Sequence, residues 1–345
     1  MKKVYLELTN KCNLNCVMCY RKAWHEDLKD MPKEYLIKCI QEIKENPLVE
    51  EVVLGGIGEP TFSEAIESTI EALRHKNITI TTNGTLMTES LLAAMIRDVN
   101  KLVISVDGIG VTFYAIRHYP LDDILANISR INALKKEMKS STPIIVFQMV
   151  LSLNNYQQIN EVIDLAHNYE VDEVILSNLI PSAIEDNELS MVKMYEKEPL
   201  ATQLKLANKH ALGKRIVLHL PEIHLKTERH CRFIEEETMM ITVDGAIAPC
   251  YRFAHDGAEV VFGRLKEIKA HSFGHIATQT LEQIWNNKEY VAYRNMVLNN
   301  HYPSCMDCDL VDGCDMAKHA ESDCFGNVPS CADCLWARKI VQCVM

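Results

Sequence analysis

From residue 1 to about residue 180, short apolar stretches alternate with longer segments whose apolar residues recur every three or four positions. The short stretches predict β-strands at Val4–Leu8, Glu51–Gly55, Ile78–Thr82, Lys101–Val106, Ile144–Leu151 and Asp172–Ser177. The longer segments predict helices at Lys33–Glu45, Ser63–Arg74, Thr88–Arg97, Leu121–Lys139 and Tyr156–Tyr169. Such alternation predicts a parallel sheet with right-handed crossovers. Six units are fewer than the eight of a complete β/α barrel, so a partial barrel and a doubly wound sheet both stay open.

The C-terminal part of the chain has a different pattern. Alternating apolar residues at Met239–Val243 are followed by Asp244-Gly245 and then by Ala246–Ala248. Because Asp-Gly between such stretches is a strong turn signal, this segment predicts a β-hairpin. Thr280–Trp285 then opens an amphipathic helix.

Composition narrows the class of protein. The formal net charge of −11 and the lack of a basic stripe argue against broad nucleic-acid binding. No stretch approaches the ~18 uninterrupted apolar residues of a membrane span, and no apolar segment typical of a signal peptide follows Met1. We therefore expect a cytoplasmic protein without membrane or nucleic-acid partners. In such a chain, 13 cysteines favour metal binding over disulfides.

Three cysteines, Cys12, Cys16 and Cys19, directly follow the first predicted strand. Three thiolates can hold three corners of a four-iron cluster and leave the fourth iron open to a small ligand. A zinc knuckle or three buried thiols are the alternatives from the residues alone. The C-x3-C-x2-C spacing at this position resembles the radical S-adenosylmethionine (SAM) superfamily. In that family the open iron chelates the methionine part of SAM, and one electron cleaves SAM to a 5′-deoxyadenosyl radical.

The resemblance implies an α/β fold, a partial (β/α)6 barrel of the TIM type that is open on one side for a large substrate. After the second strand, residues 55–60 read Gly-Gly-Ile-Gly-Glu-Pro. This run resembles the family's Gly-Gly-Glu-Pro motif, which holds the amino group of SAM, with Ile57 and Gly58 inserted. Glycines suit the role because they let backbone approach a ligand closely. The expected cofactor-binding residues of this run are Gly55, Gly56, Glu59 and Pro60.

Polar residues also follow the later strands, where functional residues of such folds collect. Ser105 resembles a residue that reaches the methionine carboxylate or the ribose of SAM. Arg117 resembles an arginine that clamps the carboxylate, for which a planar guanidinium is suited. Turn formation is the alternative for Asn83 and Asp107, and a surface position for Arg117. The further expected SAM-binding residues are Asn83, Ser105, Asp107, Arg117, Gln148 and Asn178.

A second set of cysteines lies between residues 231 and 343. Its order resembles the SPASM extension of radical SAM enzymes, whose seven-cysteine pattern binds two auxiliary four-iron clusters, although the chain departs from that pattern after Cys314. Two zinc sites are the alternative, because Cys-x2-Cys pairs often bind zinc. By position we expect one cluster on Cys305, Cys308, Cys314 and Cys331 and the other on Cys231, Cys250, Cys324 and Cys334, with Cys343 spare.

Residues 1–215 are thus expected to form a radical SAM core and residues 216–345 a SPASM domain. Segments 55–61, 177–181 and 323–336 look like the subgroup of maturases associated with tungsten-containing aldehyde ferredoxin oxidoreductases. That resemblance implies SAM, a [4Fe-4S] cluster at the radical SAM site and two auxiliary [4Fe-4S] clusters as cofactors. It implies a tungsten oxidoreductase or its pterin cofactor as substrate, and a ferredoxin or flavodoxin as electron donor.

Other functions stay open at this point. A peptide-modifying SPASM enzyme would form thioether or carbon–carbon crosslinks in a ribosomal precursor. Such enzymes often carry an N-terminal leader-binding domain, for which a first strand at Val4 leaves no room. Sulfatase-activating enzymes place an aspartate directly after the cysteine that matches Cys250, where this chain has Tyr251. An iron–sulfur electron carrier or a zinc scaffold would leave the glycine run and the strand-end residues unexplained.

Overall fold

The computed structural model describes residues 1–24, 26–192 and 198–342. Its main sheet has nine strands in the order β7-β6-β5-β4-β3-β2-β1-β8-β9. All neighbouring pairs in this sheet are parallel except β8 with β9. The strands are β1 Lys3–Leu6, β2 Glu51–Leu54, β3 Asn77–Thr82, β4 Lys101–Ser105, β5 Ile144–Leu151, β6 Glu173–Asn178, β7 Val217–His219, β8 Thr238–Ile241 and β9 Ile247–Ala248.

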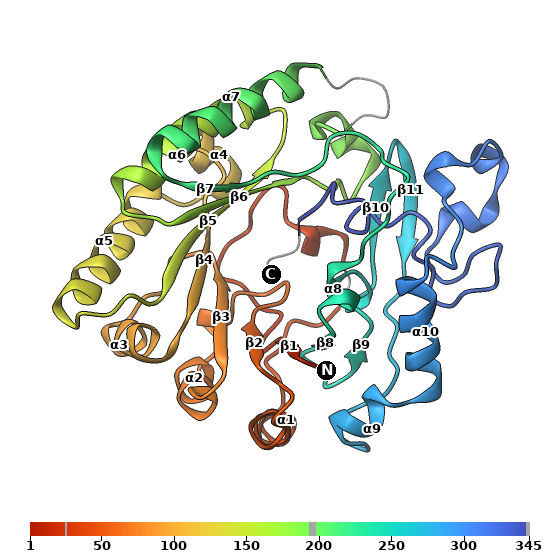
Figure 1. Cartoon of the computed structure of the whole chain (residues 1–345), viewed down its shortest axis with the longest axis horizontal. Helices are drawn as coiled ribbons and strands as arrows, with labels where there is room; N and C mark the ends of the chain where they lie inside the picture. The colour runs from red at the N-terminus through yellow and green to blue at the C-terminus, as the bar shows by residue number, and fades with distance from the viewer. Residues whose placement is uncertain (25, 193–197, 343–345) are drawn as a thin grey trace.

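Helices cover the outside of the curved sheet, as Figure 1 shows for α1, α2, α3, α5, α6 and α7. The α-helices of this half are α1 Lys33–Glu45, α2 Ile66–Leu73, α3 Glu89–Asp98, α4 Gly110–Arg117, α5 Leu121–Glu137, α6 Ile159–Asn168 and α7 Glu198–Lys214. Helix α1 illustrates the pattern, since Leu36, Cys39 and Ile43 recur on one face and are buried. The predicted α/β partial barrel is therefore confirmed. The structure also contains β7, α4 and α7, which the sequence analysis did not predict.

The predicted hairpin is also present, but it belongs to the main sheet. Strand β8 pairs in parallel with β1, with Thr238 opposite Lys3, and β9 returns antiparallel to β8. Gly245 has a φ of +83° in the turn between them, a conformation that glycine adopts without strain. The C-terminal half thus completes one side of the barrel beside β1.

The rest of the C-terminal half is built from short elements. Strands β10 Gly257–Val261 and β11 Arg264–Ile268 form a separate antiparallel pair. Thr280 and Gln283 form a capping box that starts α9 Leu281–Trp285, and α8 Arg232–Glu235 and α10 Lys288–Leu298 are the other α-helices. The 3-10 helices among the described residues are η1 Tyr20–Ala23, η2 Pro60–Phe62, η3 Tyr156–Gln158, η4 Ile184–Leu189, η5 Tyr251–Phe253, η6 Cys305–Asp307, η7 Val311–Gly313 and η8 Asp315–Lys318. In the described parts of the chain, no helix is long and apolar enough to cross a membrane.

Candidate active site

A cavity of about 320 Å³ lies at the carboxyl ends of the parallel strands. Loops at this end of a β/α barrel carry the functional residues in known enzymes of that architecture. The expected site residues that line the cavity are Cys12, Cys16, Cys19, Gly56, Glu59, Asn83, Ser105, Arg117, Gln148 and Asn178. Gly55, Pro60 and Asp107 are buried without lining it. The structure therefore brings most of the strand-end residues to one place.

The cysteine loop begins just beyond β1, and its three cysteines line the cavity. The backbone N–H of Leu14 donates to Cys12 Sγ at 3.4 Å, and the Asn83 amide donates to the same sulfur at 3.8 Å. Burial raises the pKa of Cys12 and of Cys16. The Leu14 N–H acts against this rise at Cys12, and the charge of Arg117 acts against it at Cys16. Burial outweighs these two groups, so the pKa of each of the two thiols stays above its ordinary value. Three cysteines of one loop that line the same cavity fit the open four-iron cluster.

Arg117 reaches the cavity from the end of α4, where it is held by Asp107. Its Nε donates to Asp107 Oδ2 at 2.6 Å, and Oδ1 of the same carboxylate accepts from the backbone N–H of Val150 at 2.7 Å. Burial alone would lower the pKa of Arg117, but the charges of Asp107 and Cys16 raise it overall. Asp107 therefore acts on the cavity through Arg117, whose guanidinium is a positive charge beside Cys16.

The glycine run 55–58 packs against the segment that leads into the cysteine loop. A Cβ on Gly56 would lie 2.5 Å from Glu7 Oε1, and a Cβ on Gly58 would lie 2.2 Å from the carbonyl oxygen of Thr9. The backbone N–H of Glu59 donates to the carbonyl oxygen of Lys11 at 2.7 Å. The inserted Ile57 and Gly58 are thus accommodated by close contact between two backbone segments, which requires glycine at residue 58.

The carboxylate of Glu59 is fully buried and bonded within the protein. Its Oε1 accepts from Thr61 Oγ1 at 2.6 Å and from Thr82 Oγ1 at 2.7 Å, and its Oε2 accepts from the backbone N–H of Asn83 at 2.6 Å. Burial raises the pKa of Glu59, and these hydrogen bonds act against the rise. Glu59 therefore fastens the glycine run to the end of β3.

A segment that the sequence did not indicate lines the cavity on the side of β6. Trp336 and Gln342 line the cavity, and the backbone N–H of Gln342 donates to Ser177 Oγ at 3.0 Å. The amide nitrogen of Asn178 donates to the carbonyl oxygen of Ile340 at 2.8 Å. Among the described residues, the buried Oδ1 of Asn178 has no hydrogen-bond partner. Further lining residues that the sequence missed include Tyr5, Tyr20, Phe233 and Tyr251.

Four of the later cysteines gather beside this cavity in a second site. Burial and then the charges of Cys334, Cys250 and Cys331 raise the pKa of Cys231. Cys331 and Cys334 share one turn, in which the N–H of Cys334 donates to the carbonyl oxygen of Cys331 at 3.1 Å. Tyr293 Oη lies 3.2 Å from Cys331 Sγ. Cys331 therefore lies with Cys231 and Cys250, whereas the sequence grouping placed it with Cys305.

The other cysteines lie further along the C-terminal half. Burial raises the pKa of Cys305 to about 12, and the charges of Asp333 and Cys314 also raise it. Cys308 and Cys324 are exposed. Cys343, the expected spare cysteine, lies outside the described residues. In the parts of the chain that the structure describes, no three or more His, Cys, Asp or Glu side chains form a site for a single metal ion.

Comparison with known proteins identifies the family. The model of the radical SAM superfamily matches residues 6–166, and that of the iron–sulfur cluster-binding SPASM domain matches residues 231–309. The chain is 34% identical over 353 residues to the tungsten-containing aldehyde ferredoxin oxidoreductase cofactor-modifying protein of Pyrococcus furiosus, covering 99% of this chain and 97% of that protein. The chain belongs to the radical SAM superfamily. The resemblance read from its cysteine and glycine motifs is therefore confirmed, and the protein is a radical SAM enzyme with a SPASM domain.

Solved structures of proteins that bind S-adenosylmethionine share the fold. Streptococcus suis SuiB bound to S-adenosylmethionine superposes with a TM-score of 0.64 at 18% identity, over 91% of this chain and 72% of that one. The enzyme anSMEcpe with bound AdoMet and the Cp18Cys peptide superposes with a TM-score of 0.61 at 17% identity, over 90% of this chain and 87% of that one. At these identities the superpositions establish a shared fold.

Proposed function

We propose that this radical SAM enzyme is a maturase that cleaves SAM reductively and modifies a tungsten oxidoreductase or its pterin cofactor. The observation that carries the proposal is its 34% identity over 99% of the chain to a protein named for modifying that cofactor. The cavity supports the chemistry, because three cysteines, a buried arginine and several strand-end amides and hydroxyls converge there.

The residues of the cavity have distinct proposed roles. Cys12, Cys16 and Cys19 would hold a [4Fe-4S] cluster, which when bound supplies the electron for cleavage of SAM. Polar groups of Gly56, Asn83, Ser105, Gln148 and Asn178 would orient SAM.

Arg117 has a proposed electrostatic role in the same cavity. Its charge favours the thiolate form of Cys16 and would attract the carboxylate of SAM. Asp107 limits this role, because it already accepts from Nε of the guanidinium. Tyr5, Phe233 and Trp336 add aromatic surface that would exclude water from the reacting atoms.

We further propose two auxiliary [4Fe-4S] clusters in the SPASM domain. Cys231, Cys250, Cys331 and Cys334 would bind one cluster, because their charges act on one another. Cys305, Cys308, Cys314 and Cys324 would bind the other. Residues 1–215 remain our proposed core and residues 216–345 the proposed SPASM domain, although β7, β8 and β9 all join the main sheet.

The experiment is to express a tungsten aldehyde oxidoreductase with and without this enzyme and to compare the mass of its pterin cofactor and its activity. Coexpression with the Cys16→Ala variant is the control for chemistry at the cavity, and a reduced ferredoxin or flavodoxin is the proposed electron donor. We expect a cofactor of altered mass and an active oxidoreductase only with the wild-type enzyme. Identical cofactor mass and full activity without the enzyme would refute the substrate proposal, and a modified short precursor peptide would favour peptide maturation instead.

A further inference from the structure

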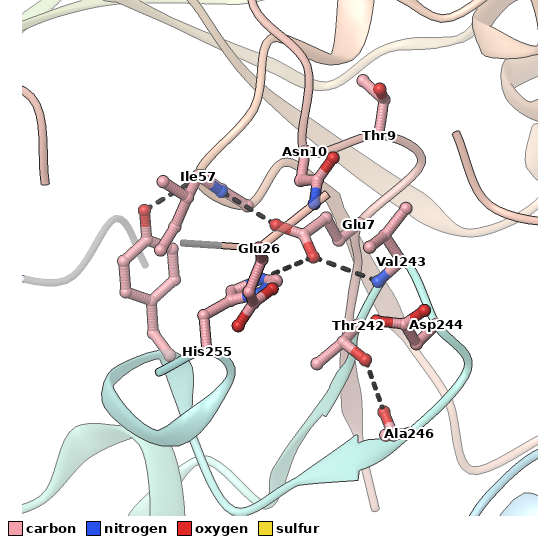
Figure 2. A network of polar contacts seen from close by, with 12 residues as sticks. Glu7, Thr9, Asn10, Glu26, Ile57, Thr242, Val243, Asp244, Ala246 and His255 are labelled. Atoms are coloured by element: carbon pink, nitrogen blue, oxygen red, sulfur yellow. Dashed lines mark hydrogen bonds and ion pairs between the residues drawn. The ribbon is translucent and has the colours of Figure 1, made fainter. Parts of the chain in front are cut away.

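A buried carboxylate, Glu7, joins β1 to the glycine run and to the C-terminal half (Figure 2). Its Oε1 accepts from the backbone N–H of Ile57 at 3.1 Å. Its Oε2 accepts from the backbone N–H of Val243, in the β8–β9 turn, at 3.0 Å and lies 2.8 Å from His255 Nε2. A charge removed from water in this way needs such partners, so the position of Glu7 is set by all three.

His255 is the charged partner of this carboxylate. Its Nε2 contacts Glu7, and its Nδ1 lies 2.8 Å from Glu26 Oε2. Both ring nitrogens thus face a carboxylate oxygen, and the hydrogen bonds to these two carboxylates raise the pKa of His255. Trp24 stacks on the ring, with 4.1 Å between centroids, and the imidazole is only 2% exposed. The ring orientation of His255 is therefore fixed by contacts on its edge and on its face.

The peptide group between Gly56 and Ile57 is held at both of its polar atoms. Its N–H donates to Glu7, as described above, and its carbonyl oxygen accepts from Tyr251 Oη at 2.9 Å. Gly56 has a φ of +150°, where a side chain would be strained and would collide with Glu7. A glycine-flanked peptide can rotate easily, so these two hydrogen bonds decide which way its N–H and C=O point.

The hydrogen bonds to both polar atoms of this peptide group depend on one short segment of the C-terminal half. Tyr251 and His255 lie just after Cys250, one directly adjacent to it and the other five residues on. Tyr251 binds the peptide oxygen directly, and His255 acts on the peptide N–H through Glu7. Segment 251–255 therefore connects a proposed auxiliary-cluster ligand to the wall of the SAM cavity.

We propose that Tyr251 and His255 are positioning residues for SAM, which together clamp the Gly56–Ile57 peptide in the orientation that the cofactor requires. The inference rests on the proposed role of the glycine run in SAM binding. It assigns to the SPASM segment a direct part in the affinity for SAM, apart from holding an iron–sulfur cluster.

The test uses the reconstituted full-length enzyme and compares Tyr251→Phe and His255→Gln with wild type. Tyr251→Phe removes one hydroxyl and leaves the ring, so it preserves the packing. His219→Gln is the matched control, because His219 Nε2 lies 2.9 Å from Glu173 on an exposed part of the sheet, away from the cavity. The readouts are KM for SAM and kcat for formation of 5′-deoxyadenosine, with iron content and melting temperature measured on each protein.

We expect KM for SAM to rise about tenfold in Tyr251→Phe and in His255→Gln, with kcat changed much less, since the lost hydrogen bonds orient the binding loop. His219→Gln should match wild type. An unchanged KM in Tyr251→Phe would overturn the clamp, as would an equal rise in the control. A wild-type enzyme that binds no SAM would instead refute the proposed function, and the clamp with it.

Discussion

The guanidinium of Arg117 and the carboxylate of Asp107 form a buried ion pair, with 2.5 Å between Nη2 and Oδ2. The side chain of Asp107 has no exposed surface, and the side chain of Arg117 is only 11% exposed. The pair lies beside Cys16 and Cys19, whose charges act on the guanidinium. A buried charge without its partner is costly, so the pair should behave as a unit.

We predict that Asp107→Asn destabilises the folded protein by about 3 kcal/mol, because it leaves the guanidinium of Arg117 buried and uncompensated. Asparagine keeps the size of the side chain, so packing should change little. Chemical denaturation of the anaerobic protein measures the loss. Asp315→Asn is the control, since its partner Lys318 and Asp315 itself are both largely exposed and such pairs contribute little. Equal destabilisation by the two variants would contradict a special role for the buried pair.

A second prediction concerns Gly56. Gly56→Ala should cost about 1–3 kcal/mol of stability and weaken SAM binding, since its Cβ would lie 2.5 Å from Glu7 Oε1 at a φ of +150°. Gly213→Ala is the matched control, because nothing lies within 4 Å of the position of its Cβ and alanine favours the helix. Thermal unfolding and SAM titration of both variants measure the difference. Wild-type affinity for SAM in Gly56→Ala would contradict this prediction, because it would show that the glycine run can shift away from Glu7 without loss of binding.

The sheet was predictable because buried parallel strands give continuous apolar runs between amphipathic helices. Strands β1–β6 were placed within two residues of their observed ends. Strand β7 was missed because three half-buried or exposed residues carry no clear pattern. The hairpin of β8 and β9 was predicted, but its pairing with β1 joins segments more than 230 residues apart, which local periodicity does not encode.

The site was predictable only in part, for a similar reason. Residues at strand ends could be named because parallel strands bring their carboxyl ends together. The contact of His255 with Glu7 spans 248 residues, and glutamate is a residue type that is usually exposed, so no local signal indicated it. The sequence analysis also assigned Cys331 and Cys334 to different clusters. The Cys-x2-Cys spacing instead suits a single turn that presents both sulfurs to one site.

The grouping of the auxiliary cysteines gives a third prediction. Anaerobic reconstitution should yield about twelve irons in the wild-type chain, as expected for three four-iron clusters. Cys250→Ala and Cys331→Ala should each lose about four irons, and the double variant should lose no more, because both residues serve one cluster. The double variant Cys305→Ala/Cys331→Ala should instead lose about eight irons, because the two residues serve different clusters. Iron analysis with Mössbauer spectra measures these losses, and a shared loss for Cys305 and Cys331 would restore the sequence grouping.

The fourth prediction is a pH dependence that His255 causes. Burial lowers its pKa, but hydrogen bonds and charges of Glu26 and Glu7 raise it overall from 6.5 to about 9. The folded state therefore binds the proton more tightly than the unfolded state does. This stabilisation is fully present below pH 6.5 and is lost as the pH rises through about 9.

The melting temperature of wild type relative to His255→Gln should therefore fall between pH 6.5 and about 9. The ionisable groups that act on this imidazole are Glu7 and Glu26. A difference between wild type and variant that stays constant across the range would contradict a charged His255.

The most direct test of the account is SAM cleavage by the anaerobically reconstituted enzyme, with 5′-deoxyadenosine and methionine quantified after addition of a strong one-electron reductant. Cys16 lines the cavity, whereas Cys39 is buried in α1 with no exposed surface. We predict formation of 5′-deoxyadenosine by wild type, its abolition in Cys16→Ala and near-normal formation in Cys39→Ala. Undiminished cleavage by Cys16→Ala, or none by the fully reconstituted wild type, would contradict the assignment of this cavity.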